Sequence, residues 1–131
     1  MKFLLVFLLA LLVPIAATAS PMTEADKINA LIATVDQLPG AVFIRNGSEY
    51  PAAKAAEHLR MKWQYAGKRI KTAEDFIKYC ASASSMSGNR YQIRFADGHT
   101  VYSADFFHQQ LRRIEAGEKP VVAKPAVAGT K

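Results

Sequence analysis

The chain has 131 residues, of which 17 are Lys or Arg and 11 are Asp or Glu, so its formal net charge at pH 7 is +6. The cations are scattered along the sequence without an Arg/Lys block, which argues against a nucleic-acid-binding protein. The single cysteine cannot form a disulfide within the chain, so hydrophobic packing must hold the fold together.

Residues 1–19 have the features of a secretory signal peptide. Lys2 supplies a positive start, residues 3–13 are an unbroken apolar run, and small residues up to Ala19 stand at the cleavage spacing. The apolar run is too short to span a bilayer, which disfavours a retained membrane anchor. We therefore expect cleavage between Ala19 and Ser20, a periplasmic or secreted protein, and no stable membrane anchor afterwards.

A helix and a short strand are predicted next. Thr23 is a good N-cap, with Asp26 three residues later as a partner for a capping box. Apolar residues then follow at spacings of three and four, typical of an amphipathic helix: Ile28, Leu31, Ile32, Val35 and Leu38. Residues 41–45 are apolar and β-prone, and the dipeptide Asn46-Gly47 after them is the strongest turn signal in the chain.

Two further helices are predicted in the middle of the chain. Pro51 suits the first turn of a helix that extends to about Tyr65 and is broken by Gly67. One stripe of this helix is apolar: Ala52, Ala55, Ala56, Leu59, Trp63 and Ala66. Thr72 begins the next helix, whose inward-facing residues are Phe76, Ile77 and Cys80. We expect Cys80 to be a buried, inert thiol, the alternative being an intermolecular disulfide.

A hairpin and a last helix complete the predicted domain. Residues 91–95 alternate between apolar and polar, Asp97-Gly98 is a hairpin turn, and residues 100–102 are the return strand. Ser103 is expected to cap a helix whose apolar face is Phe106, Phe107, Leu111 and Ile114. The sequence thus predicts a helix-rich α+β single domain over residues 20–115, with about four helices. Its sheet is a small antiparallel hairpin, or three-stranded if residues 42–44 join it. Residues 116–131 lack periodicity and are expected to be a disordered tail.

The string FIRNG, residues 43–47, places a guanidinium and an amide directly after an apolar strand. Arg45 can present a planar fork to a carboxylate or phosphate, with Asn46 beside it. Alternatively, Arg45 pairs with an internal acid such as Glu57 or Glu74, and the Asn-Gly dipeptide only turns the chain. Arg45 and Asn46 are therefore candidate ligand-binding residues with a structural alternative.

His58 and Lys62 lie four residues apart and share one face of the predicted second helix. A histidine can act as a general base and a lysine as an anchor for an anion, but neither residue has a partner evident from the sequence. Lys62 can instead extend its ammonium group outward over apolar neighbours. The three histidines lack the spacing of metal ligands, so we expect no metal site and no cofactor.

Residues 82–89, SASSMSGN, form a hydroxyl-rich loop. To act as a nucleophile, Ser84, Ser85 or Ser87 would need a base and an oxyanion hole, and the GxSxG motif is absent. One alternative is a helix C-terminus with Gly88 at positive φ and the hydroxyls bonded to backbone groups. Another is an anion-binding loop of N–H groups and hydroxyls. The cation that completes it would be Arg45, Lys62 or Arg90.

Several of these strings together resemble the YfeK-like family of small exported bacterial proteins. They are FIRNG, residues 55–59 with Lys62, TAEDFI at 72–77 and AS-x-SSMSG at 81–88, and the resemblance covers about residues 28–115. It implies a bacterial, periplasmic domain without an assigned activity, cofactor or substrate. It also implies that the recurrent polar positions of the family are Arg45, Asn46, Gly47, His58, Lys62, Ser84, Ser85, Ser87 and Gly88.

The resemblance also implies a cysteine just before the F-x-RNG string, which many members of that family carry. That place is occupied here by Ala41 or Val42, so a disulfide implied by the family does not transfer to this chain.

We interpret the chain as a non-enzymatic domain that binds a small anionic molecule or a periplasmic protein. Its site would form where the Arg45 turn, the Lys62 helix face and the loop at residues 84–88 meet. A serine hydrolase remains open, with His58 as the base, and it predicts a hydrogen bond between a loop serine and the imidazole. A purely structural role also remains open, in which Arg45 forms a buried ion pair.

Overall fold

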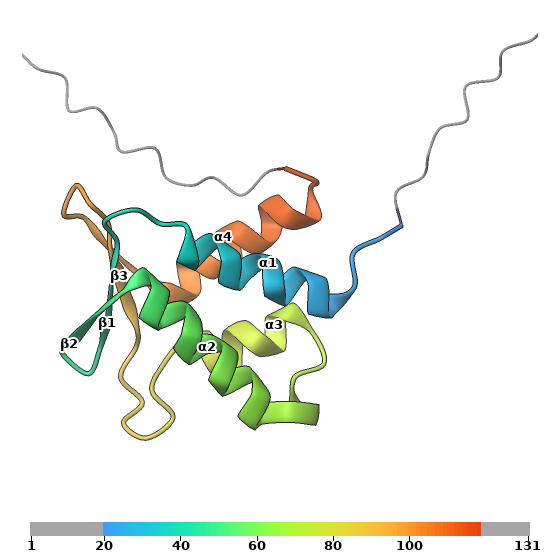
Figure 1. Ribbon diagram of the computed structural model, residues 1–131. Coiled ribbons are helices and arrows are strands. Elements are labelled where there is room, and N and C mark those ends of the chain that lie inside the picture. The colour runs from blue at the N-terminus through green and yellow to red at the C-terminus, as the bar shows by residue number, and fades with distance from the viewer. Residues whose placement is uncertain (1–19, 119–131) are drawn as a thin grey trace, which may run out of the picture.

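The computed structural model describes residues 20–118, which form a four-stranded antiparallel sheet with helices against one face (Figure 1). The helices are α1 (Glu24–Asp36), α2 (Ala52–Ala66), α3 (Ala73–Phe76) and α4 (Ser103–Glu115), with a 3-10 turn η1 (Gly67–Arg69) and a π-helical segment η2 (Ile77–Ala81). The strands are β1 (Val42–Arg45), β2 (Ser48–Pro51), β3 (Gln92–Arg94) and β4 (Thr100–Tyr102). The predicted signal peptide and residues 119–131 of the predicted tail lie outside the described residues. The prediction of disorder is wrong for residues 116–118, because their amides donate to carbonyls of the last turn of α4 and end the helix. Among residues 20–118, no helix combines the length and the apolar character needed to cross a membrane.

The sheet has the strand order β2-β1-β3-β4 and so consists of two hairpins joined by the pairing of β1 with β3. Phe43 of β1 stands opposite Ile93 of β3, and both side chains are buried against the helices. Because successive side chains of a strand point to opposite faces, Arg45 lies on the same face as Phe43. The helix-covered face of the sheet therefore ends in a guanidinium at one corner.

The fold class is the one the sequence predicts, but the sheet has one more strand than expected. The missed strand is β2, whose four residues are all exposed and carry no apolar alternation. It follows directly from the turn, where Asn46 and Gly47 have φ of 49° and 76°. Positive φ at both central residues is the geometry of a tight hairpin turn, so the turn dipeptide sends the chain back along β1.

The helix starts follow the predictions with two exceptions. Pro51 was predicted in the first turn of α2 but precedes it as the N-cap residue, because it is also the last residue of β2. Thr23 and Asp26 exchange both hydrogen bonds of a capping box at the start of α1, and Thr72 does the same with Asp75 at the start of α3. The expectation that Ser103 caps α4 is wrong. Tyr102 is the N-cap residue. Ser103 is the first residue of the helix, and its side chain is buried. The reason is that β4 runs directly into α4, which turns Ser103 toward the interior.

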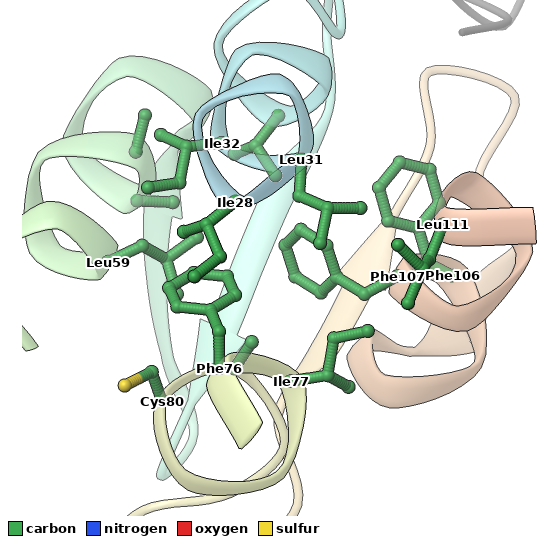
Figure 2. Close-up of a cluster of buried hydrophobic side chains, with 14 of the residues drawn as sticks. Ile28, Leu31, Ile32, Leu59, Phe76, Ile77, Cys80, Phe106, Phe107 and Leu111 are labelled. Atoms are coloured by element: carbon green, nitrogen blue, oxygen red, sulfur yellow. The ribbon is translucent and has the colours of Figure 1, made fainter. Parts of the chain in front are cut away.

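The core lies between the four helices and the sheet. Figure 2 shows side chains of α1, α2, α3, η2 and α4 pointing toward one another. The apolar positions predicted for these helices lie in the core or pack against it, except for Ala52. Cys80 is 1% exposed and is a free thiol, and burial raises the pKa of this thiol. Its side chain is therefore packed as a hydrophobic group, as expected from its position.

Candidate functional site

The side chain of Arg45, at the end of β1, contacts the side chain of His58 on α2. Arg45 Nη1 lies 2.7 Å from Nε2 of His58 and 3.5 Å from Nδ1, and both side chains are half-buried. Because a guanidinium can only donate, Nε2 accepts the hydrogen bond and the remaining imidazole proton resides on Nδ1. His58 is thus held as a neutral base by a cation.

The surroundings of His58 reinforce this state. Its pKa is lowered from the ordinary histidine value, first by burial and then by the positive charges of Arg45 and Lys62. Burial and like charge both disfavour the imidazolium form. At neutral pH His58 therefore adds no charge to the site and leaves the two cations in excess.

Lys62 lies further along the same face of α2 and connects it to the start of β3. Its Nζ donates to the hydroxyl of Tyr91 at 3.1 Å and to the carbonyl of Ala83 at 3.4 Å. The ammonium also lies 5.0 Å from the centroid of the Tyr91 ring, within range of a cation–π interaction. Lys62 does not snorkel over apolar neighbours, then, but bridges two elements with its charge.

The internal acids proposed for Arg45 pair elsewhere, so that alternative is wrong. Glu57 forms an ion pair with Lys54 at 3.3 Å, and Glu74 contacts His108 at 2.9 Å. Within residues 20–118, neither Arg45 nor Lys62 forms an ion pair with a carboxylate. The helix α2 and the end of β1 thus hold two neighbouring positive charges without a negative partner in this part of the chain.

Asn46 joins the hairpin turn to the hydroxyl-rich loop. Its Oδ1 accepts from Oγ of Ser87 at 2.7 Å and from Nδ2 of Asn89 at 3.1 Å, while its Nδ2 donates to Oγ of Ser84 at 3.4 Å. We call these four residues the Asn46 cluster. They bring together segments that are 38 to 43 residues apart in sequence, visible in Figure 1 as the turn between β1 and β2 and the loop before β3.

The loop is also closed by its own backbone. Ser84 N donates to the carbonyl of Asn89 at 2.9 Å, and Gly88 N donates to the carbonyl of Ser84 at 2.8 Å. Gly88 has a φ of 74°, the left-handed conformation expected for it. Ser84, Ser87 and Gly88 therefore shape the loop, and Ser85 is exposed beside them without a side-chain hydrogen bond to any described residue.

None of the loop serines contacts the candidate base. In the part of the chain that the structure describes, no hydrogen bond joins Ser84, Ser85 or Ser87 to His58. The hydroxyls of Ser84 and Ser87 are engaged in the Asn46 cluster instead. The serine–imidazole contact that the hydrolase alternative predicts is thus not formed.

A cavity of about 270 Å³ opens between the sheet and α2, with Arg45 and His58 in its wall. We call it the Arg45 pocket. Its inner wall consists of buried side chains: Phe43, Ala55, Leu59, Tyr91 and Ser103. Exposed side chains form the rim, among them Tyr50 and Met61. The pocket is thus an apolar cavity whose half-buried polar groups are one guanidinium and one imidazole.

Tyr91 and Ser103 are pocket residues that the sequence reasoning missed. Continuing the strand registers places Arg45, Tyr91 and Ser103 in one row across the covered face, and Ser103 N donates to the Tyr91 carbonyl at 2.9 Å. Ser103 is 2% exposed, and its hydroxyl forms no hydrogen bond with another described residue. The register of the predicted Asp97-Gly98 hairpin was the signal that could have paired Tyr91 with Ser103.

The chemistry available here is that of anion binding. Apart from the Lys54–Glu57 ion pair at the rim, the charged and polar groups in or beside the Arg45 pocket include two cations, Arg45 and Lys62, the neutral imidazole of His58 and the hydroxyl of Ser103. Among the described residues, these groups form no base–nucleophile pair. Between residues 20 and 118, no three His, Cys, Asp or Glu side chains are grouped as metal ligands. The arrangement can hold a negative group against Arg45, in a setting where apolar walls strengthen the attraction.

Comparison with known proteins gives one family and one curated relative. Residues 22–115 match the "Family of unknown function (DUF5329)". Over 92 residues, covering 70% of this chain and 77% of the relative, the sequence is 37% identical to "Uncharacterized protein YfeK" of Salmonella typhimurium (strain LT2). No solved structure matches the chain. The family match spans both the Arg45 pocket and the Asn46 cluster.

Proposed function

Since the chain belongs to this family of unknown function (DUF5329), as its resemblance to YfeK-like proteins predicted, we propose a function from its own geometry. The protein is a non-enzymatic, exported domain that binds a small anionic ligand in the Arg45 pocket. The observation that supports it is the half-buried guanidinium of Arg45, whose one side-chain hydrogen-bond partner among the described residues is the neutral imidazole of His58.

A guanidinium in such a place has capacity left for a ligand. Arginine carries five N–H donors, and the contact with His58 uses Nη1 only. Charged groups removed from water are normally paired with an opposite charge, because desolvating them alone is costly. An anion in the pocket supplies that missing charge, and the ammonium group of Lys62 nearby adds to the positive potential.

The test is a thermal-shift screen of the purified, processed chain against small anions, including acetate, hexanoate, benzoate and inorganic phosphate. A ligand that binds the native state raises the melting temperature in proportion to the logarithm of its concentration above Kd. Arg45→Gln should abolish the shift. Arg112→Gln removes the same charge from an exposed position on α4 outside the pocket and should keep it. Equal shifts in the two variants, or no shift with any anion, would refute the proposal.

Export is supported by the signal-peptide features of residues 1–19. Expression of the full chain in a bacterium, followed by fractionation and intact-mass measurement, tests it. The expected product lies in the periplasmic fraction or the medium and begins at Ser20. A product that keeps residues 1–19 in the cytoplasmic fraction would contradict it.

A further inference from the structure

We infer that the ligand of the Arg45 pocket is a small monocarboxylate with an apolar body, either an aromatic ring or a short alkyl chain. The inference rests on the proposed function and specifies its ligand class. Three properties of the pocket carry it: the composition of the walls, the charge that the walls can neutralise, and the volume.

The walls fit an apolar body. The inner wall holds the side chains of Phe43, Ala55 and Leu59, all at most 8% exposed, and the ring of Tyr91. At the rim, Tyr50 and Met61 are 37% and 47% exposed, so a ligand that enters would cover apolar surface now in contact with water. Burial of such surface drives binding, by about fourfold in affinity for each methylene group removed from water.

The charge of the walls fits one negative charge. Arg45 is the cation of the pocket that lacks an acidic partner among the described residues, because Lys54 at the rim is paired with Glu57. Glu57 itself lies at the rim and opposes further negative charge. A dianion such as phosphate loses more hydration on entry than one guanidinium returns. A carboxylate is a monoanion, and its planar shape matches the two-pronged donor edge of arginine.

The volume fits a small molecule. The cavity of about 270 Å³ lies just under the range of roughly 300–1,000 Å³ that is typical of pockets for drug-sized ligands. A benzoate or hexanoate therefore suits the space, whereas a two-chain lipid exceeds it. The hydroxyl of Ser103 on the inner wall, which bonds to no other residue in the described part of the chain, offers one hydrogen bond to a polar substituent at the far end of the body.

The experiment is a calorimetric titration of the processed chain at pH 7.5 with acetate, butyrate, hexanoate, benzoate, phosphate and the neutral hexanamide. We expect the affinity to rise more than tenfold from acetate to butyrate and again from butyrate to hexanoate, because each step adds two methylenes. Benzoate should bind more tightly than acetate, and hexanoate more tightly than phosphate or hexanamide.

Two methionine variants provide a matched control. Met61→Ser removes apolar surface from the rim. It should weaken the affinity for hexanoate several-fold and leave the affinity for acetate unchanged. Met86→Ser makes the same replacement at a residue that is 98% exposed and outside the pocket, and should change neither.

The outcomes separate the inference from the proposed function. If all carboxylates bind equally and all depend on Arg45, the inferred preference for an apolar body is wrong, but the proposed anion site is supported. If phosphate binds best through Arg45, the monocarboxylate class is wrong. If hexanamide equals hexanoate, or no probe depends on Arg45, the proposed function itself fails.

Discussion

Arg45 at the end of β1 donates a hydrogen bond to Nε2 of His58 on α2 across 2.7 Å, so a permanent cation is held by a base that must remain unprotonated. The contact forms one side of the Arg45 pocket and fixes the guanidinium, whose other donors bond to no residue between 20 and 118. It persists only while the imidazole can accept. We therefore expect the geometry of the pocket to depend on pH.

Acidification should destabilise the protein through His58. Burial, and then the charges of Arg45 and Lys62, lower the pKa of His58 in the folded state, so the unfolded chain takes up this proton more readily. The stabilisation is complete well above the ordinary histidine value of about 6.5 and is lost as pH falls through it toward the lower folded value. Urea denaturation between pH 8 and 5 should show a steeper loss for the wild type than for His58→Gln. Parallel curves would show that His58 is not responsible.

Arg45→Ala should cost only about 1–2 kcal/mol of unfolding free energy at pH 7.5, because its partner is a neutral imidazole in a half-buried position. Breaking a buried ion pair would cost roughly 3–5 kcal/mol. Equilibrium urea denaturation distinguishes the two values. A loss of unfolding free energy above about 3 kcal/mol would instead indicate that Arg45 has a structural role.

Asn46→Ala should destabilise by about 2–4 kcal/mol, because it removes the three hydrogen bonds of the Asn46 cluster and leaves alanine at positive φ. Asn46→Gly loses the same bonds but accepts that φ freely, so it should cost less, and the difference between the variants isolates the backbone. In both, hydrogen exchange at the amides of Ser84 and Gly88 should accelerate. Unchanged exchange would show that Asn46 does not hold the loop.

Two buried serines should respond differently to replacement by alanine. Ser103→Ala should change stability by less than about 0.5 kcal/mol, because the hydroxyl has no partner among the described residues to lose. Ser84→Ala should cost about 0.5–1.5 kcal/mol, because its Oγ accepts from Asn46 and from the amide of Ser87. Thermal and urea denaturation of both variants provide the comparison. A costlier change at Ser103 would reveal a structural bond and remove its hydroxyl from the pocket.

Local patterns made most of the fold predictable. The spacing of Ile28, Leu31 and Val35 and the capping box of Thr23 with Asp26 are each encoded within a few residues, and the structure has them where expected. Strand β2 could not be found in this way, because an exposed edge strand needs no apolar alternation. It is defined by its hydrogen bonds to β1 instead.

For the site, the sequence predicted which segments lie close together but not which of their residues contact one another. The structure does bring the Arg45 turn, the Lys62 face of α2 and the hydroxyl-rich loop together, but it divides their residues. Asn46, Ser84, Ser87 and Gly88 hold the loop, whereas Arg45 and His58 line the pocket. The partner of Arg45 depends on how α2 crosses the sheet, which no local spacing encodes.

The strand order also constrains how the chain reaches its native state. Each outer pair, β1 with β2 and β3 with β4, is a short-range hairpin, and isolated hairpins of this size are only marginally stable in water. The central pairing of Phe43 with Ile93 closes a loop of roughly fifty positions, an entropic cost best met after the intervening helices have condensed. We therefore expect the seam between β1 and β3 to form late in folding, and the Arg45 pocket, which is lined from both β1 and Tyr91 beside β3, to be complete only after that step.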